Sequence, residues 1–267
     1  MPYYELLTRP VPDPDRTLRY GPHPDQIIDI HEGSGGPLVI LLHGGFWRAQ
    51  HDRTHTRPMA AALAAEGYTV CVPEYRRVGH DGGGYPGTFD DVATAIDTLI
   101  ATSGGEAPVL VGHSAGGHLA LWYALRHRLP ATSPWHAHPE IGGVVSLAGI
   151  SDVTGAYTTH LGNSAAHNLL HNRPDHLNEV DPSRLLPYGD RPLILVHGSK
   201  DRVVPVEMSR HFAALTGTAE LRELPDTGHF KLIDPLSRAW PTVLEAIASI
   251  SRRPLLSMEP TSASPQK

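Results

Sequence analysis

The sequence predicts an α/β fold, in which a mostly parallel central sheet carries helices on both faces. From residue 38 onward, short apolar runs of strand length alternate with segments whose apolar residues recur at helical spacing. The run 38–42 is continuously apolar, as expected for a strand that is covered on both faces. Glycine-rich and polar segments follow several of these runs directly, at the edge where parallel sheets bind ligands.

Residues 1–251 of the 267-residue chain are predicted to form one domain. Residues 1–24, rich in proline and charge, are expected to be an irregular lead-in, and the polar residues 252–267 a disordered tail. Apolar runs predict strands at 27–30, 38–42, 69–73, 109–111, 143–147, 193–196 and 220–224. Helical spacing predicts helices at 57–66, 89–100, 206–215 and 241–250, and another directly after the turn at 112–117.

Composition narrows the classes of function. The formal net charge of −6 argues against nucleic acid or an anionic membrane as a partner. Cys71 is the only cysteine, which excludes an intramolecular disulfide, and its apolar surroundings predict a buried, inert thiol. The 18 histidines are scattered without ligand spacing, so no metal is expected. The N-terminus lacks a signal-peptide pattern and no run reaches the length of a membrane span, so a cytoplasmic location is expected, with the oligomeric state left open.

The stretch 107–124 carries the strongest motif. It reads strand, then Gly112-His113-Ser114-Ala115-Gly116, then helix, which is the G-x-S-x-G pattern of a nucleophile elbow in its required context. Only glycine tolerates the close backbone contacts of so tight a turn. The turn is predicted to raise the Ser114 hydroxyl above the sheet edge, with the Ala115 N–H aimed at a developing oxyanion.

A serine hydroxyl needs a neighbouring base, and the base in turn needs an acid that orients it. His229 is the candidate base, because it follows the last predicted strand and has a glycine beside it. Asp201 is the candidate acid, directly after the strand at 193–196. Asp226 competes for this role but is disfavoured, since it lies only three residues before His229. The chain order Ser114, Asp201, His229 is that of the α/β hydrolases.

The segment His43-Gly44-Gly45-Phe46-Trp47 follows the strand at 38–42, where the second part of an oxyanion hole is expected. The N–H groups of Gly45 and Phe46 are predicted to join that of Ala115 as donors. His43 is expected to brace the loop by hydrogen bonding rather than to act as a base. Phe46 and Trp47 either line a substrate pocket or anchor the loop in the core, and His113 is also predicted to contact substrate.

A second glycine motif is rejected. Gly82-x-Gly84-x-x-Gly87 matches the dinucleotide-binding fingerprint, which requires its glycines immediately after a strand. The nearest predicted strand ends at Pro73, so residues 81–87 are interpreted as a loop at the surface or the rim of the pocket.

With these motifs in place, residues 20–250 resemble the α/β-hydrolase superfamily. The His43–Trp47 loop, the segment 112–119 and the His229-Phe230 segment leading to Asp234-Pro235 are similar to kynurenine formamidases (arylformamidases) and small carboxylesterases. Phe46 stands where esterases of the hormone-sensitive-lipase type carry a third glycine, which argues against that branch.

The resemblance implies a Ser114–Asp201–His229 triad that cleaves small esters or N-formyl aryl amides through an acyl-enzyme, without a metal or organic cofactor. Residues 151–190 would be a cap-like insertion that determines substrate size. Four leucines of this segment are expected to roof the pocket: Leu161, Leu169, Leu170 and Leu177. The alternatives are a general short-chain carboxylesterase without formamidase activity and a non-catalytic binding protein of the same fold.

Overall fold

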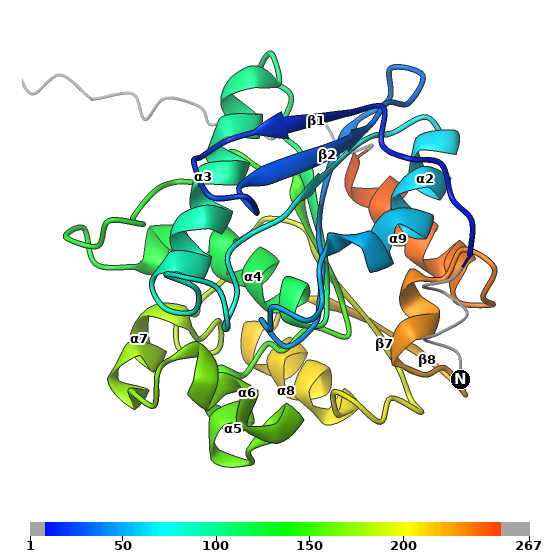
Figure 1. The fold of residues 1–267 in the computed structure, drawn as a ribbon. Coiled ribbons are helices and arrows are strands. Elements are labelled where there is room, and N and C mark those ends of the chain that lie inside the picture. The colour runs from blue at the N-terminus through cyan, green and yellow to red at the C-terminus, as the bar shows by residue number, and fades with distance from the viewer. Residues whose placement is uncertain (1–8, 252–267) are drawn as a thin grey trace, which may run out of the picture.

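The computed structural model describes residues 9–251, whose helices and loops surround one central sheet (Figure 1). The sheet has eight strands in the order β1-β2-β4-β3-β5-β6-β7-β8. Strands β1 and β2 run antiparallel to their neighbours, and the pairs from β4 to β8 are parallel. The strands are β1 Arg16–Arg19, β2 Ile27–His31, β3 Leu38–Leu42, β4 Thr69–Pro73, β5 Val109–His113, β6 Gly143–Leu147, β7 Leu193–Gly198 and β8 Glu220–Leu224.

The expectation of an irregular lead-in is wrong for its second half, because β1 lies within residues 1–24. Arg16–Arg19 pairs with β2 at the edge of the sheet, and Thr17 Oγ1 donates to Asp29 Oδ1 at 2.9 Å. This strand has a single apolar residue, Leu18, so no alternation marks it in the sequence. Its pairing with β2 stabilises it, and local propensity does not.

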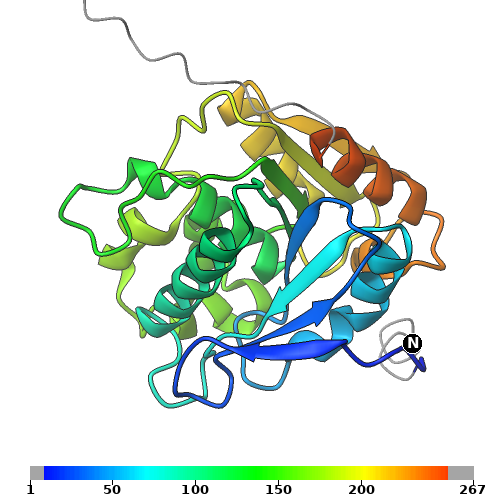
Figure 2. The same cartoon turned by 90° about the horizontal axis from the view of Figure 1, so that it is seen from above.

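Helices cover both faces of the sheet, as Figure 2 shows from above. Alternate residues of β3 enter separate cores: Val39 and Leu41 lie in one, Ile40 and Leu42 in the other. Helices α2 and α9 contribute to the first core, and α3, α4 and α8 to the second. The helices are α2 Arg57–Ala65, α3 Gly87–Thr102, α4 Ala115–Ala124, α5 Val153–Thr158, α6 Leu161–Leu169, α7 Leu177–Val180, α8 Val206–Thr216 and α9 Trp240–Ser251. Short 3-10 turns are η1 Arg53–Thr56, η2 Arg126–Arg128, η3 Pro174–His176 and η4 His229–Ile233.

The segment 151–190 contains the short helices α5, α6 and α7 and lies at the end of the sheet where the parallel strands finish (Figure 1). Three of the four leucines that were expected to roof the pocket lie in the core instead. Leu169, Leu170 and Leu177 are buried in the same core as α3 and α4, and only Leu161 is partly exposed. They therefore attach this cap segment (residues 151–190) to the domain.

The glycines of the rejected dinucleotide motif serve a compact loop. A side chain on Gly87 would lie 1.9 Å from the carbonyl oxygen of Gly82, and one on Gly83 would lie 1.8 Å from that of Arg77. Gly87 is also the first residue of α3, two residues earlier than predicted.

Candidate active site

Ser114 occupies the sharp turn between β5 and α4. Its φ and ψ of 56° and −120° lie in a region that non-glycine residues rarely adopt, and its N–H donates to the Leu147 carbonyl at 2.9 Å. A Cβ on Gly112 would lie 2.1 Å from the Gly116 carbonyl oxygen, and one on Gly116 would lie 2.1 Å from that of Leu42. Both flanking glycines are thus required by backbone contacts.

Asp201 and His229 form a close pair at the ends of β7 and β8. Asp201 follows β7 in the loop to α8, and His229 is the first residue of η4. The His229 Nδ1 atom lies 2.6 Å from Asp201 Oδ2. The other carboxylate oxygen, Oδ1, accepts the backbone N–H groups of Val203 at 2.7 Å and Val204 at 2.9 Å. The carboxylate is therefore fixed on one side by the backbone and faces the imidazole on the other.

A second imidazole reaches the same carboxylate. His197, the fifth residue of β7, places Nε2 3.3 Å from Asp201 Oδ2. Burial alone would raise the pKa of Asp201, but the hydrogen bonds from His197 and His229 together hold it well below its ordinary value. Asp201 therefore stays ionised across the physiological range.

His113 connects this pair to the serine. Its ring centroid lies 4.5 Å from that of His229, and its Nε2 lies 3.2 Å from the His229 carbonyl oxygen. Burial, and then the neighbouring His229, lower the pKa of His113 well below its ordinary value, so it is neutral and its Nε2–H donates to that carbonyl. The competing acid Asp226 is exposed, and its N–H donates to Ser199 Oγ at 3.0 Å.

The loop after β3 lies against the serine turn. A side chain on Gly44 would approach the Cβ of Ser114 to 3.0 Å. Gly45, Phe46 and Trp47 all have positive φ, of 110°, 52° and 56°. Within residues 9–251, the N–H groups of Gly45, Phe46 and Ala115 donate to no protein acceptor. They belong to the loop after β3 and to the first residue of α4, directly after Ser114.

Two of the three residues predicted to contact substrate, Trp47 and His113, have side chains that are buried in contacts within the protein. Trp47 is 1% exposed, and its Nε1 donates to His118 Nδ1 at 3.2 Å. His118 in turn donates from Nε2 to the Val180 carbonyl at 2.8 Å. Trp47 thus anchors the loop, and His113, also 1% exposed, lies beneath His229. Phe46 is half-buried.

The cap segment contacts the same loop. A side chain on Gly162 would lie 2.3 Å from the Phe46 ring, and the Arg48 guanidinium donates to the carbonyls of Gly162 at 2.6 Å and Asn163 at 2.8 Å. Gly162, Asn163 and Ser164 all have left-handed backbone conformations. Ser114 and His229 are only 2% and 5% exposed. The site is thus nearly closed, with the cap resting on the loop.

Sequence reasoning missed His197 and Glu74. Both are polar residues at the carboxyl end of a buried strand, His197 within β7 and Glu74 directly after β4. A polar residue that is buried at that edge indicates a functional site, because polar side chains are usually exposed to solvent. Their partners are Asp201 for His197 and His43 for Glu74, and the local sequence pattern does not predict either pairing.

Other classes of site find no support in the described chain. Residues 9–251 hold no group of three or more His, Cys, Asp or Glu side chains arranged for a metal ion. No helix in this range is long and apolar enough to cross a membrane. Cys71 is buried, and burial raises the pKa of its thiol to about 12, in line with the inert thiol expected from the sequence.

Comparison with known proteins places this geometry in context. The family model described as BD-FAE matches residues 27–215. Esterase LipC of Mycobacterium tuberculosis is 27% identical over 253 residues, which cover 85% of this chain and 62% of LipC. Kynurenine formamidase of Salmo salar is 27% identical over 226 residues, covering 75% of this chain and 68% of that protein. The mycobacterial esterase LipQ is 26% identical, and the chain spans about half of its length, at 52%.

Solved structures share the architecture. Esterase B from Lactobacillus rhamnosis superimposes with a TM-score of 0.76 at 17% identity, covering 94% of this chain and 90% of that one. A truncated carbohydrate esterase from gut microbiota has a TM-score of 0.72 at 16% identity, covering 91% and 100%. At these identities the likeness concerns the fold, and it confirms the fold class predicted from the sequence.

Proposed function

Since the chain belongs to the BD-FAE family of α/β hydrolases, we propose that it is a serine hydrolase of small carboxylic esters. One observation carries the proposal: the strained Ser114 directly follows His113, whose ring lies 4.5 Å from that of His229, and His229 pairs with Asp201 at 2.6 Å. The esterase names of its mycobacterial relatives support the same substrate class.

In the proposed reaction, His229 takes the proton of Ser114 Oγ as the hydroxyl attacks the ester carbonyl. The N–H groups of Gly45, Phe46 and Ala115 stabilise the negative charge on the carbonyl oxygen. His229 then gives its proton to the departing alcohol, leaving an acyl-serine that water hydrolyses by the same route. Asp201 keeps Nδ1 of His229 protonated, so Nε2 is the basic nitrogen.

A fluorophosphonate probe tests the nucleophile, because it reacts covalently only with an activated serine. We expect the wild-type protein to gain one probe adduct by mass spectrometry and Ser114→Ala to gain none. Ser199→Ala is the matched control, since Ser199 follows β7 at the same edge but bonds to the Asp226 backbone. Equal labelling of wild type and Ser114→Ala, or no labelling of either, contradicts the proposal; the second result favours a non-catalytic binding protein.

Aryl formamides are a second candidate substrate class. The His43–Trp47 loop and the similarity to the Salmo salar kynurenine formamidase favour it. The same triad would attack a formyl carbonyl and release an aryl amine. We would compare kcat/KM for N-formylkynurenine with that for p-nitrophenyl acetate. A value for the formamide no higher than for the acetate leaves only the esterase assignment.

The cap segment is proposed to set the size of the substrate. Arg48 holds residues 162–163 against Phe46, next to the proposed oxyanion donors. Arg48→Ala removes charge-assisted hydrogen bonds worth about 1.5 kcal/mol or more. The cap segment can then move away from the loop and admit substrates with longer acyl groups. We therefore expect the ratio of kcat/KM for p-nitrophenyl octanoate over acetate to rise roughly tenfold.

Arg184→Ala is the control for this experiment. Arg184 contacts Thr154 and Asn178, all within the cap segment, and makes no contact with the loop after β3 among the described residues. The ratio should keep its wild-type value in this variant. An unchanged ratio in Arg48→Ala, or an equal rise in both variants, would show that Arg48 does not limit substrate length.

A further inference from the structure

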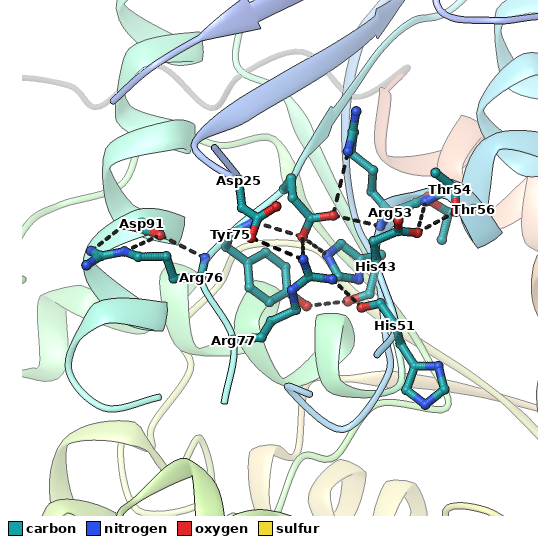
Figure 3. A network of polar contacts seen from close by, with 12 residues as sticks. Asp25, His43, His51, Arg53, Thr54, Thr56, Tyr75, Arg76, Arg77 and Asp91 are labelled. Carbon is teal, nitrogen blue, oxygen red and sulfur yellow. Dashed lines mark hydrogen bonds and ion pairs between the residues drawn. The ribbon is translucent and has the colours of Figure 1, made fainter. Parts of the chain in front are cut away.

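A carboxylate lies buried beneath the proposed oxyanion loop. Glu74, directly after β4, is completely buried, although a lone buried charge is costly. Its Oε1 lies 2.8 Å from His43 Nε2 and accepts the Tyr75 N–H at 3.0 Å. Its Oε2 accepts the Arg53 N–H at 2.9 Å. Figure 3 shows His43, Arg53 and Tyr75 gathered around this point.

The same carboxylate holds the loop at both ends. His43 is the first residue of the loop after β3, and Arg53 is the first residue of η1, which follows this loop. Arg77, 2% exposed, pairs with Glu74 Oε1 at 3.3 Å and donates from its other terminal nitrogen to the His51 carbonyl (Figure 3). His51 packs closely against Gly45, since a side chain on Gly45 would lie 2.4 Å from the His51 Cβ. A displacement of Glu74 would therefore move both ends of the segment 43–53.

Both ring nitrogens of His43 have contacts. Its Nε2 faces Glu74, and its Nδ1 lies 2.8 Å from the Gly44 carbonyl oxygen, so both ring nitrogens face oxygen acceptors. A neutral imidazole donates from only one nitrogen, whereas the imidazolium donates from both. The ring also stacks on Tyr75, with 4.4 Å between centroids, and the Tyr75 hydroxyl donates to the His43 carbonyl at 2.7 Å.

The surrounding charges balance this cation. Arg53 pairs with Asp29 at 2.7 Å and Arg77 with Asp25 at 3.6 Å, and both arginines also lie near Glu74, which is closest to His43 at 2.8 Å. Burial alone would raise the pKa of Glu74, but the charge and hydrogen bond of His43 and the Arg77 guanidinium lower it to about 2. His55 meets the His43 ring edge-on at 5.7 Å, and burial followed by the His43 charge lowers its pKa to about 3.

We propose that Glu74 is a positioning residue that holds His43 as an imidazolium and thereby fixes the N–H groups of Gly45 and Phe46. Gly44, between His43 and these donors, already lies against Ser114. The inference rests on the proposed function for its kinetic consequence. Its structural half, the charged His43–Glu74 pair, stands on the contacts alone.

Glu74→Gln removes the negative charge of this side chain and keeps its shape. The amide has one acceptor oxygen where the carboxylate has two, so its NH2 group must face one of the donors that Glu74 accepts. The loop loses its fixed position, and its donors act mainly on the transition state. We expect kcat for p-nitrophenyl acetate to fall roughly 10- to 100-fold with KM within about twofold of wild type, somewhat less than the complete loss of one oxyanion donor.

The first measurement uses the wild-type protein, so it does not depend on a variant that folds. We expect the 15N resonances of the His43 ring, assigned with His43→Gln, to show two protonated nitrogens at neutral pH. In Glu74→Gln the same ring should show one protonated nitrogen. A neutral His43 in the wild-type protein would overturn the proposal, whether or not the protein hydrolyses esters.

Asp91→Asn is the matched control for the kinetics. Asp91 is also a buried carboxylate with an arginine partner, Arg76 at 2.7 Å, but the two lie to one side of the loop contacts (Figure 3). We expect this variant to lose stability but to keep the wild-type kcat. An imidazolium at His43 together with an unchanged kcat in Glu74→Gln would refute the positioning role. A wild-type protein without ester hydrolysis would refute the proposed function and leave the test of the charged pair intact.

Discussion

Asp201→Asn is expected to lower kcat for ester hydrolysis by about 10⁴. The carboxylate oxygen Oδ1 accepts two backbone N–H groups, from Val203 and Val204, so the asparagine oxygen must remain there. The new NH2 group then takes the position of Oδ2 and faces Nδ1 of His229. His229 accepts from it on Nδ1 and carries its proton on Nε2, the nitrogen that must take the serine proton. The base is thus held in the wrong tautomer.

Steady-state kinetics with p-nitrophenyl acetate would measure this loss, with Asp226→Asn as the control. Asp226 is the acid nearest to His229 in the sequence, but it is exposed and contacts Ser199 instead. Its variant should keep kcat within about twofold of wild type, the range of an ordinary surface substitution. A large loss in Asp226→Asn with little loss in Asp201→Asn would reverse the assignment of the acid.

Acidification is expected to unfold the protein between about pH 6 and pH 4. His55 and His118 are buried, and burial is the largest cause that lowers their pKa values from 6.5 to about 3 and about 4. Each is neutral when folded and takes up a proton when unfolded. Their stabilising effect is complete above pH 6.5 and is lost as the pH falls towards the folded values. At pH 5 each costs about 2 kcal/mol, and His113 acts in the same direction.

Two such losses approach the lower end of the 5–15 kcal/mol that holds a typical domain together. Urea unfolding followed by circular dichroism at a series of pH values would measure the slope. His118→Gln should reduce the dependence on pH, whatever it does to stability at pH 7. The control is His160→Gln, because His160 is exposed on the cap segment. A free energy of unfolding that stays constant from pH 7 to pH 4.5 would contradict the expectation.

The sequence predicted the parallel core of the sheet and its helices because periodicity and glycine placement are local signals. Ser114, Asp201 and His229 were predicted as site residues because each follows a recognisable strand, and the structure brings Asp201 and His229 into contact. The strand β1 was not predicted, because only its pairing with β2 makes it a strand. The burial of Trp47, and its bond to His118, depend on packing between segments 71 residues apart, which no local pattern records.

The edge position of β8 has a consequence for how activity is lost. Among the residues that the structure describes, β8 pairs on one side only, with β7, and its residues are partly exposed along its length. The proposed base, His229, follows this strand, whereas Ser114 stands at the centre of the sheet. Edge elements open locally at a lower free energy than central ones. In mild denaturant, ester hydrolysis should therefore fade before the circular dichroism of the domain changes, so inactivation would report the fraying of one strand.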